Sequence, residues 1–544
     1  MRGPRLTDLI LAGVAVLASR HSLVAQPNGG PVVTNQDLLN GFKDPTRWLT
    51  YAGDYSGQEH SPLTQISPAN VKTLAPRWTF QTDLPVGGRG FETHSLLLDG
   101  ILYVTGINDN AWALDARTGR PFWHYRRDLP SGLKYCCGPV NRGFGILGDR
   151  LFKVTLDAHL IALNMKTGAV IFDVALEDYT HGYSATLAPL IVNGKVIVGA
   201  AGGEYPTRGF LAAYDATTGE RAWRFYTVPG AGERGSETWP GTDVMARGGG
   251  SIWMTGTYDP DLNLIYFGTG NPNPDFYGDD RKGDNLYTES LIALDPNTGT
   301  LKWHYQFTPH DTHDWDSTQV PILADVPVNG RIRKVVLFAN RNGFFYSLDR
   351  STGELLFAKP FTKAATNWAQ KIGSDGRPVV WNENGKPDAC LSDSRGSTNF
   401  NPPSFDPALN LFFVNVRETC VVYVPIKPSS IKVGEALGGG ALQRYGEPYG
   451  ALRALNATTG ERNWEFRYTT YSMAGVLSTA AGLVFTGDNE GNFIAIDAKT
   501  GKALWHYQMG GSLWGAAPTT YLLDGRQWVL VPAGTTLTAF GLPE

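Results

Sequence analysis

The sequence lacks an excess of basic charge, and this excludes one large class of partners. Its 47 Lys and Arg residues are balanced by 51 Asp and Glu residues, which gives a formal net charge of -4. A surface that binds nucleic acid needs a basic field to attract the phosphate backbone, so we expect no nucleic-acid partner. The chain also lacks a C-x-x-C-H motif, so it attaches no c-type haem of its own.

Long apolar runs are scarce as well. The run over residues 9–18 is about half the roughly 20 residues that a membrane-spanning helix needs. Two arginines precede this run and small residues follow it up to Ala25, which is the pattern of a secretory signal peptide. We predict a signal peptide over residues 1–25 and a single mature domain over residues 26–544, exported to the periplasm and without a membrane span.

Cysteine is also rare. The whole chain holds only Cys136, Cys137, Cys390 and Cys420. An even number of cysteines in an exported protein favours disulfides. Neighbouring cysteines rarely bond to each other, because the small ring strains the peptide between them. Two buried free thiols are therefore the alternative for the adjacent pair.

Glycine and tryptophan are abundant, with 64 and 15 residues, and both occur in a repeated segment. The template reads Ala-x-Asp/Asn-x-x-Thr-Gly-x-x-x-Trp. Five copies follow it closely, over residues 113–123, 213–223, 293–303, 454–464 and 495–505. Two weaker copies, over 162–172 and 347–357, carry phenylalanine in place of tryptophan. Internal repeats of this kind indicate units that stack into a larger architecture.

Each copy predicts two strands joined by a tight turn. The Asp or Asn can satisfy turn amides, and the glycine tolerates a positive φ. Further strands precede most copies, so each unit is expected to be a four-stranded antiparallel blade. The segments 74–80 and 527–542 could share an eighth blade and close the ring, which removes exposed sheet edges. We predict an all-β, eight-bladed β-propeller, with long insertions between residues 219 and 299 and between 353 and 460.

Several rarer motifs give the repeat a specific resemblance. They are YCCGPVNRG (135–143), GGEYPTRGFLAAYDATTGE (202–220), YFGTGNPNP (266–274) and TPHDTHDWD (308–316). Together with the tryptophan-docking repeat, they resemble the pyrroloquinoline-quinone (PQQ) alcohol dehydrogenases, the periplasmic methanol and ethanol dehydrogenase family of quinoproteins. The resemblance covers nearly all of the predicted mature chain, with the motifs in the family's order.

The resemblance implies a PQQ site with flat walls and a cation for the cofactor's carboxylates. In the family, a vicinal disulfide like Cys136–Cys137 covers one face of PQQ, and a tryptophan at the position of Trp253 lies against the other. The implied cofactor-binding residues are Glu92, Cys136, Cys137, Arg142, Thr186, Gly202, Gly203, Trp253 and Asn399. We expect Cys390 and Cys420 to form a second disulfide, which would staple the insertion over 360–450.

The resemblance also implies a metal ion, either calcium or a lanthanide(III), held by oxygen ligands. Glu204, Asn271 and Asp314 match the family's three protein ligands. Asp316 matches an aspartate that is found in the family's lanthanide-type enzymes, although it could instead only support its loop by hydrogen bonding. Asp314 is further implied as the general base, and Arg341 as the cation near the reactive quinone carbonyl.

The stretch over 308–316 contains three other ionisable residues without such a role. His310 and His313 could be interpreted as a transition-metal pair, but the oxygen-rich partners argue against this. We expect His313 to face substrate or solvent, and Asp311 to be structural. Two departures from the family are Ala474, where a second indole is expected, and Ala201, where a serine contact is common. They predict a roomier or less polar cofactor site.

The resemblance implies oxidation of a small, primary alcohol to an aldehyde, with electrons passed to a separate cytochrome c. Two alternatives are open: a non-catalytic propeller scaffold of the outer-membrane assembly type, and a PQQ dehydrogenase for another hydroxylated substrate. The scaffold alternative leaves Cys136–Cys137 and the candidate metal ligands without a purpose. The sequence does not identify the alcohol, and it does not decide between a monomer and a homodimer.

Overall fold

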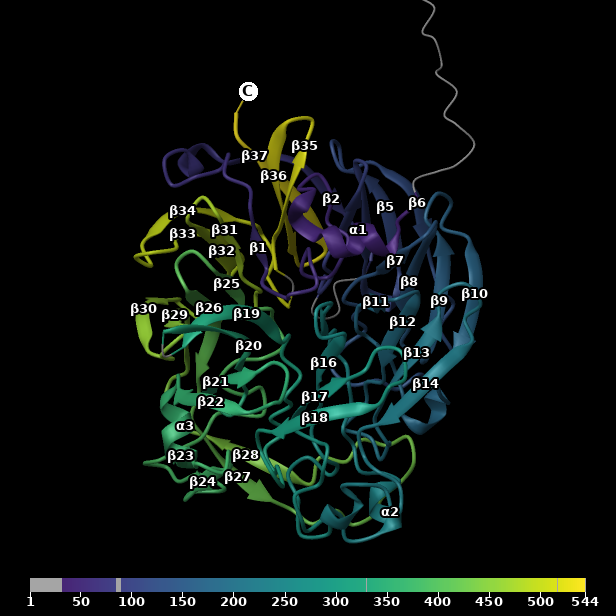
Figure 1. Ribbon diagram of the computed structural model, residues 1–544, viewed down its shortest axis with the longest axis vertical. Helices are drawn as coiled ribbons and strands as arrows, with labels where there is room; N and C mark the ends of the chain where they lie inside the picture. Colours follow the sequence, from purple (N-terminus) through teal and green to yellow (C-terminus); the bar gives the residue numbers. More distant parts are fainter. Residues whose placement is uncertain (1–31, 85–89, 329, 516, 544) are drawn as a thin grey trace, which may run out of the picture.

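The computed structural model describes residues 32–84, 90–328, 330–515 and 517–543, and these residues form one ring of β-sheets (Figure 1). Eight four-stranded antiparallel blades surround a central axis. The predicted eight-bladed propeller is confirmed. The predicted signal peptide lies outside the described residues.

The blades follow one another along the chain, and we number them by the order of their innermost strands. Blades 1 to 4 comprise β3–β6 (Leu96–Leu98, Ile101–Thr105, Ala111–Asp115, Pro121–Tyr125), β7–β10 (Gly145–Leu147, Arg150–Val154, His159–Asn164, Val170–Ala175), β11–β14 (Leu190–Val192, Lys195–Gly199, Phe210–Asp215, Arg221–Tyr226) and β15–β18 (Thr257–Asp259, Leu264–Gly268, Ser290–Leu294, Leu301–Gln306).

Blades 5 to 8 comprise β19–β22 (Ile322–Val328, Arg331–Ala339, Phe344–Asp349, Leu355–Pro360), β25, β26, β29 and β30 (Ser404–Asp406, Leu411–Glu418, Tyr449–Asn456, Arg462–Arg467), β31–β34 (Leu477–Thr479, Leu483–Gly487, Asn492–Asp497, Ala503–Gln508) and β35–β37 with β2 (Thr519–Leu523, Arg526–Ala533, Thr536–Gly541, Ala75–Gln81). The short β1 (His60–Ser61) adds a parallel strand to blade 7.

Blade 8 closes the ring with strands from both ends of the chain. Its outermost strand is the N-terminal β2, which pairs antiparallel with the C-terminal β37. This is the closure that the segments 74–80 and 527–542 predicted. Because the two ends share one sheet, the ring presents no open edge between its first and last blades.

The repeated segment forms the turn between the third and fourth strands of seven blades. The template glycines all have φ between +71° and +76°, a conformation that favours glycine: Gly119, Gly168, Gly219, Gly299, Gly353, Gly460 and Gly501. The aromatic residue of each of the first six copies packs against the glycine turn of the next blade. For example, a Cβ at Gly299 would lie 2.5 Å from the Trp223 ring, and the Trp223 Nε1 donates to the Pro296 carbonyl at 2.9 Å.

A segment before the first blade connects the innermost strands of most blades by hydrogen bonds. Between residues 48 and 59 its backbone or side chains hydrogen-bond to the innermost strands of blades 1, 3, 4, 5, 6 and 7, at Leu97, Ile191, Tyr258, Leu323, Phe405 and Ser478. Such contacts join blades that are far apart in sequence and would otherwise touch only their neighbours. The segment was not predicted, since it has no repeat and almost no regular structure.

The remaining elements are short. The α-helices are α1 (Asn35–Asn40), α2 (Thr242–Met245) and α3 (Lys363–Trp368), and the two hairpins outside the blades are β23–β24 (Ala369–Ile372, Pro378–Val380) and β27–β28 (Val421–Pro425, Gly440–Arg444). Single 3-10 turns occupy Gly41–Lys43, Val71–Thr73, Ile107–Asp109, Tyr179–His181 and Ser236–Thr238. Within the described ranges, no helix has the length and apolarity needed to cross a membrane.

The antiparallel order places all long connections on one face of the ring. In blades 1 to 7, the repeat turn joins strands three and four, so the connections from strand two to three and from strand four to the next blade lie at the opposite end. The insertions over 227–256, 361–403 and 419–448 all belong to these connections. The predicted insertions therefore extend one face, which is where a site is expected.

Candidate active site

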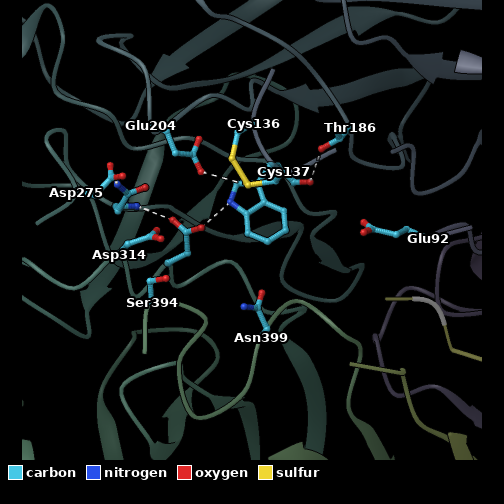
Figure 2. The surroundings of a disulfide bond; sticks show 12 residues. Glu92, Cys136, Cys137, Thr186, Glu204, Asp275, Asp314, Ser394 and Asn399 are labelled. Atoms are coloured by element: carbon cyan, nitrogen blue, oxygen red, sulfur yellow. Dashed lines mark hydrogen bonds between the residues drawn. A yellow bond between two sulfur atoms is a disulfide. The ribbon is translucent and has the colours of Figure 1, made fainter. Parts of the chain in front are cut away.

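A cavity of about 160 Å³ opens on the face that carries the long connections. It is lined by Cys136, Cys137, Val140, Arg142, Thr186, Ala201, Gly202, Glu204, Trp253, Asp314, Asp316, Arg341, Ser394, Arg395, Asn399, Phe400, Met473 and Trp514. Figure 2 shows several of these side chains around the disulfide. Among the predicted site residues, Glu92, Gly203 and Asn271 lie beside this cavity without lining it.

Arg142 anchors one end of the cavity through a buried ion pair. Its Nη2 lies 2.7 Å from Glu92 Oε2, and both side chains are almost fully buried. Its Nη1 donates to the Thr186 hydroxyl at 2.6 Å. The guanidinium also lies 4.8 Å from the centre of the Trp253 ring and 4.6 Å from that of Phe400. Four predicted cofactor residues therefore form one connected group: Glu92, Arg142, Thr186 and Trp253.

Two flat surfaces face the cavity. One is the disulfide between Cys136 and Cys137, and the other is the half-buried indole of Trp253. The indole is held at both ends, because its Nε1 donates to Asp316 Oδ2 at 2.9 Å and its ring packs edge-on against Phe400 at 5.4 Å between centroids. A fixed aromatic face is what a planar cofactor needs. The expected disulfides Cys136–Cys137 and Cys390–Cys420 are both present.

Asp316 is the most connected carboxylate of the cavity. Its Oδ1 accepts from the Asn271 backbone N–H at 2.7 Å, and its Oδ2 accepts from Trp253 and from Arg341 Nη2 at 3.0 Å. None of these donors belongs to its own loop. Asp316 thus links the connections of blades 3, 4 and 5 instead of only supporting the turn in which it lies.

Arg341 is buried and holds the neighbouring aspartate loop in place. Its Nη1 donates to the carbonyls of Asp314 and Ser394 at 2.7 and 2.9 Å, and it lies 3.6 Å from Asp314 Oδ1. Its Nη2 reaches Asn399 Oδ1 at 3.2 Å as well as Asp316. The guanidinium therefore determines where the Asp314 carboxylate stands.

Negative charge exceeds positive charge in this half of the cavity. Burial raises the pKa of Asp314 well above its usual range, and repulsion by Asp316 raises it further, while Arg341 opposes this. Burial and the nearby Glu204 likewise raise the pKa of Asp275. One arginine among four carboxyl groups is an oxygen-rich environment that a hard cation would stabilise.

The candidate ligand Asn271 is oriented by its neighbours. Its Nδ2 donates to Asp275 Oδ1 at 2.8 Å, and a Cβ at Gly203 would lie 2.7 Å from its Oδ1. Glycine is required at Gly203 for this approach. Gly202, with φ +105°, is equally constrained, because a Cβ there would lie 2.4 Å from the Gly182 carbonyl.

Among the described residues, the tightest group of candidate ligand atoms is formed by Glu204 with Cys136 and Cys137, all within 4.8 Å. This group is not a metal site, because disulfide sulfurs carry no thiolate charge. The Cys137 Sγ lies 3.7 Å from Glu204 Oε1. The carboxylate of Glu204 therefore lies directly beside the disulfide and lines the same cavity as Asp314 and Asp316.

The expectation that His313 faces substrate or solvent is wrong. Its side chain is fully buried, stacked on Trp315 at 4.1 Å, and it lines no part of the cavity. Its Nδ1 lies 3.0 Å from Asp311 Oδ1, and its Nε2 lies 2.6 Å from the Glu383 carbonyl. Asp311 also accepts from the Trp315 N–H, so it is structural as expected. The positive φ of Asp314, +59°, marks where this loop turns its carboxylate away from the buried stack.

Comparison with known proteins identifies the family. The family model for the β-propeller domain of PQQ glucose/ethanol/alcohol dehydrogenases matches residues 48–365 and 444–529. The quinoprotein alcohol dehydrogenase PedH of Pseudomonas putida is 37% identical over 98% of this chain and 93% of its own length. The chain belongs to the quinoprotein alcohol dehydrogenase family.

Solved structures agree with this assignment. The quinohemoprotein alcohol dehydrogenase ADHIIG of Pseudomonas putida has a TM-score of 0.88 and 34% identity, over 94% of this chain and 82% of that one. A europium-containing methanol dehydrogenase has a TM-score of 0.86 and 30% identity, over 93% of this chain and 100% of that one. As a member of the family, the chain is a PQQ-dependent alcohol dehydrogenase, and the scaffold alternative is not supported.

The residues present fit the cofactors that this family uses. Two flat faces, a buried arginine and an excess of carboxylates are the features that a planar anionic quinone and a cation require. Arg142 and Arg341 each have a buried Nε–H that donates to no acceptor among the described residues. The residues of this cavity therefore fit a planar anionic quinone together with a hard cation.

Sequence reasoning missed several cavity residues. The indole that is absent at Ala474 has a counterpart in Trp514, which lines the cavity from the connection between blades 7 and 8. Met473 pairs with Trp514 in a parallel bridge and lines the cavity beside it. Asp275 was also missed, although its place four residues after Asn271 was the available signal. With Trp514 in place, the absence of an indole at Ala474 does not by itself leave the cavity open.

Proposed function

We propose that this quinoprotein oxidises a small, primary alcohol to an aldehyde with PQQ and one metal ion, in the periplasm. On this proposal, residues 1–25 are removed on export and residues 26–544 form the single mature domain. The cofactor-binding residues are Glu92, Cys136, Cys137, Arg142, Thr186, Gly202, Gly203, Trp253 and Asn399. The single observation that carries the proposal is the convergence of Asp314, Arg341 and the two flat faces in one cavity.

The metal is held by Glu204, Asn271, Asp314 and Asp316 in this proposal, and we infer that it is a lanthanide. A trivalent ion favours more anionic oxygen ligands than calcium does, and the crowded carboxylates are costly without such a charge. Asp316 supplies the additional carboxylate. Its Oδ2 accepts two hydrogen bonds and its Oδ1 accepts one, so Oδ1 retains a lone pair that can contribute a ligand atom.

The protein contributes orientation and one proton acceptor. Asp314 takes the proton of the substrate hydroxyl while a hydride leaves the carbon that bears this hydroxyl, so the alcohol loses both and becomes an aldehyde. Arg341 fixes Asp314 through its backbone carbonyl and its carboxylate. When bound, PQQ supplies the hydride acceptor and the metal supplies a Lewis acid. Trp253 and the disulfide exclude water from the two faces between which this takes place.

The electron acceptor is a separate carrier in this proposal, a cytochrome c. The chain has no haem-attachment motif of its own, and its described residues form β-blades instead of the βαβ units of a nicotinamide domain. Activity is expected with an artificial dye or a cytochrome, but not with NAD. Robust reduction of NAD by the pure protein would refute this part. A mass measurement in solution distinguishes a monomer from a homodimer.

The test is reconstitution of the purified protein. Addition of PQQ and a light lanthanide should give retained cofactor absorbance and alcohol-dependent dye reduction. A matched variant, Arg142→Gln, should lose PQQ retention, because it removes the buried cation next to Trp253 while leaving the carboxylates of the metal site in place. Retention of PQQ by the variant at wild-type level would contradict the role of Arg142.

A further inference from the structure

A second cavity, of about 120 Å³, lies beside the active-site cavity on the same face of the ring. Its lining comes from the loop before blade 6 and from the insertion that contains β27 and β28. Arg395 lines both cavities, so the two spaces share one wall. The proposed reaction uses nothing in this second cavity.

Positive charge dominates the second cavity. Arg395, Arg417 and Arg444 all line it, against the single carboxylate of Asp393. Arg417 is buried and forms a two-bond pair with Asp393, at 2.7 and 2.9 Å. In the part of the chain that the structure describes, neither Arg395 nor Arg444 forms an ion pair. Two guanidinium groups are therefore available to an anionic ligand.

The second cavity is lined by side chains that buried contacts and a disulfide hold in place. The buried Arg417 lies 5.0 Å from the centre of the Tyr471 ring, which forms one side, and its Nε is buried without a hydrogen-bond partner. Cys420 lies in the lining and is bonded to Cys390, so the disulfide fixes this rim. Planar guanidinium groups on a fixed frame are suited to bind a carboxylate through two parallel hydrogen bonds.

The wall around Asp314 differs in charge from the second cavity. Glu204, Asp314 and Asp316 lie with Arg341 in that half of the active-site cavity, whereas Arg395, Arg417 and Arg444 lie with only Asp393 in the second cavity. A substrate with a carboxylate at one end and a hydroxyl at the other is repelled in one orientation and attracted in the other. The attractive orientation places the hydroxyl end beside Asp314.

We propose that the second cavity is a carboxylate-binding subsite, and that the enzyme's preferred alcohols are ω-hydroxy carboxylates. This inference rests on the proposed function. In the reaction, the hydroxyl carbon gives its hydride to PQQ and the hydroxyl gives its proton to Asp314, forming the ω-aldehyde carboxylate. The distal carboxylate is unchanged and stays bound to Arg395 and Arg444.

The experiment compares a charged substrate with a neutral one of equal chain length. The reconstituted enzyme is assayed by dye reduction with ω-hydroxyhexanoate and with n-hexanol, for the wild type and for Arg444→Gln. Arg444 lies in the second cavity only, at the exposed end of β28, so its replacement should not disturb folding. Loss of one charge-assisted contact should raise the KM for ω-hydroxyhexanoate about tenfold. The kinetics with n-hexanol should stay unchanged.

The matched control is Arg331→Gln, an exposed arginine of β20 that lines neither cavity. It should leave the KM of both substrates unchanged. Equal kcat/KM for the two substrates in the wild type, together with no effect of Arg444→Gln, would overturn the proposal. A turnover of n-hexanol in that case would show that the proposed function stands and only the subsite fails.

Binding measured by calorimetry separates the subsite from catalysis. Hexanoate, which has no hydroxyl, should bind the wild-type protein and bind Arg444→Gln about tenfold more weakly. Inorganic phosphate is the second probe: weaker competition by phosphate than by hexanoate identifies the carboxylate of a chain as the ligand. Equal, chain-independent binding of both anions would contradict a substrate subsite. Absence of hexanoate binding to the wild type would overturn the proposal even if the protein lacked dehydrogenase activity.

Discussion

At the scale of single residues, Asp316 joins the metal half of the cavity to the cofactor half. It accepts from the Asn271 backbone, from Trp253 and from Arg341, so its loss should disturb both halves. We expect Asp316→Ala to lower lanthanide-dependent activity by at least roughly tenfold, a typical effect of losing a ligand or its support. PQQ retention should fall less. Steady-state rates with calcium and with a light lanthanide measure the first effect, and bound-cofactor absorbance measures the second.

Asp314→Ala is the companion to this variant, and it should abolish turnover with either metal because it removes the proposed base. A wild-type enzyme that is fully active with calcium and indifferent to lanthanides would show that Asp316 is not a ligand. Its hydrogen bonds to Trp253 and Arg341 would then be its whole role.

The burial of His94 makes a prediction about how the free energy of unfolding depends on pH. Burial lowers its pKa to about 3, against about 6.5 in an unfolded chain. The Ala517 N–H donates to its Nε2 at 3.1 Å, so the folded state holds a neutral imidazole. Between pH 6.5 and pH 3 the unfolded state therefore binds the additional proton, and stability falls as the pH is lowered through this window.

The measurement is the free energy of unfolding of wild type and His94→Gln from pH 7 down to pH 4. The wild type should lose up to about 1.4 kcal/mol per pH unit more than the variant. Parallel pH profiles of the two proteins would contradict a buried neutral histidine. The prediction concerns the difference between the two proteins, so titrating groups that do not contact His94 cancel to first order. Glu59, whose Oε1 lies 3.3 Å from His94 Nδ1, does not cancel.

The residues that a motif carries lie together in the fold, because Cys136, Arg142, Asp314 and Asp316 all line one cavity. Their roles stay predictions. Trp514 could not be placed, because its segment has no repeat and its approach to the cavity depends on pairing with Met473. His313 was misplaced since its burial depends on a stack with Trp315 that only the fold creates.

At the scale of the element, the repeat turn makes a prediction about docking. Gly353 and Gly510 both have φ +76°, but a Cβ at Gly353 would lie 2.6 Å from the Trp303 ring, whereas a Cβ at Gly510 would meet nothing within 4 Å. Both alanine variants should bear the strain of positive φ, roughly 1 kcal/mol. Gly353→Ala should cost about 1–3 kcal/mol more, because it also displaces the docked indole.

Denaturant unfolding of the two variants measures this difference directly. Equal destabilisation by Gly353→Ala and Gly510→Ala would mean that the indole contact contributes nothing beyond the turn. The aromatic would then fill space without joining blades, contrary to the hydrogen bonds that several of these indoles make to the next turn.

The strands of the repeat were predictable because each copy combines an apolar strand, a turn residue and a glycine. The hairpins β23–β24 and β27–β28 were not, because they are short and follow no repeated template. The sequence predicted only that a long insertion lies between residues 353 and 460, where both hairpins occur. What positions β27–β28 is its disulfide and its contact with distant loops, such as the hydrogen bond from the Leu437 N–H to the Glu204 carbonyl at 2.7 Å.

At the scale of the whole molecule, the closed ring explains how residues from most of the chain meet in one cavity. The lining extends from Cys136 to Trp514, and each residue arrives on a connection at the same face. Closure by β2 and β37 fixes the first and last of these connections relative to each other. Such a site depends on the complete ring, so we expect activity and global stability to be lost together on heating.

The central claim is that this cavity holds PQQ and a metal ion to oxidise an alcohol, and a titration tests it most directly. Purified protein with excess lanthanide is titrated with PQQ, while alcohol-dependent dye reduction and retained absorbance are followed together. We predict that both rise in parallel and saturate at one PQQ per chain, and that chelation of the metal abolishes the activity. Absence of retained PQQ and of alcohol-dependent reduction, with lanthanide and with calcium alike, would contradict the account.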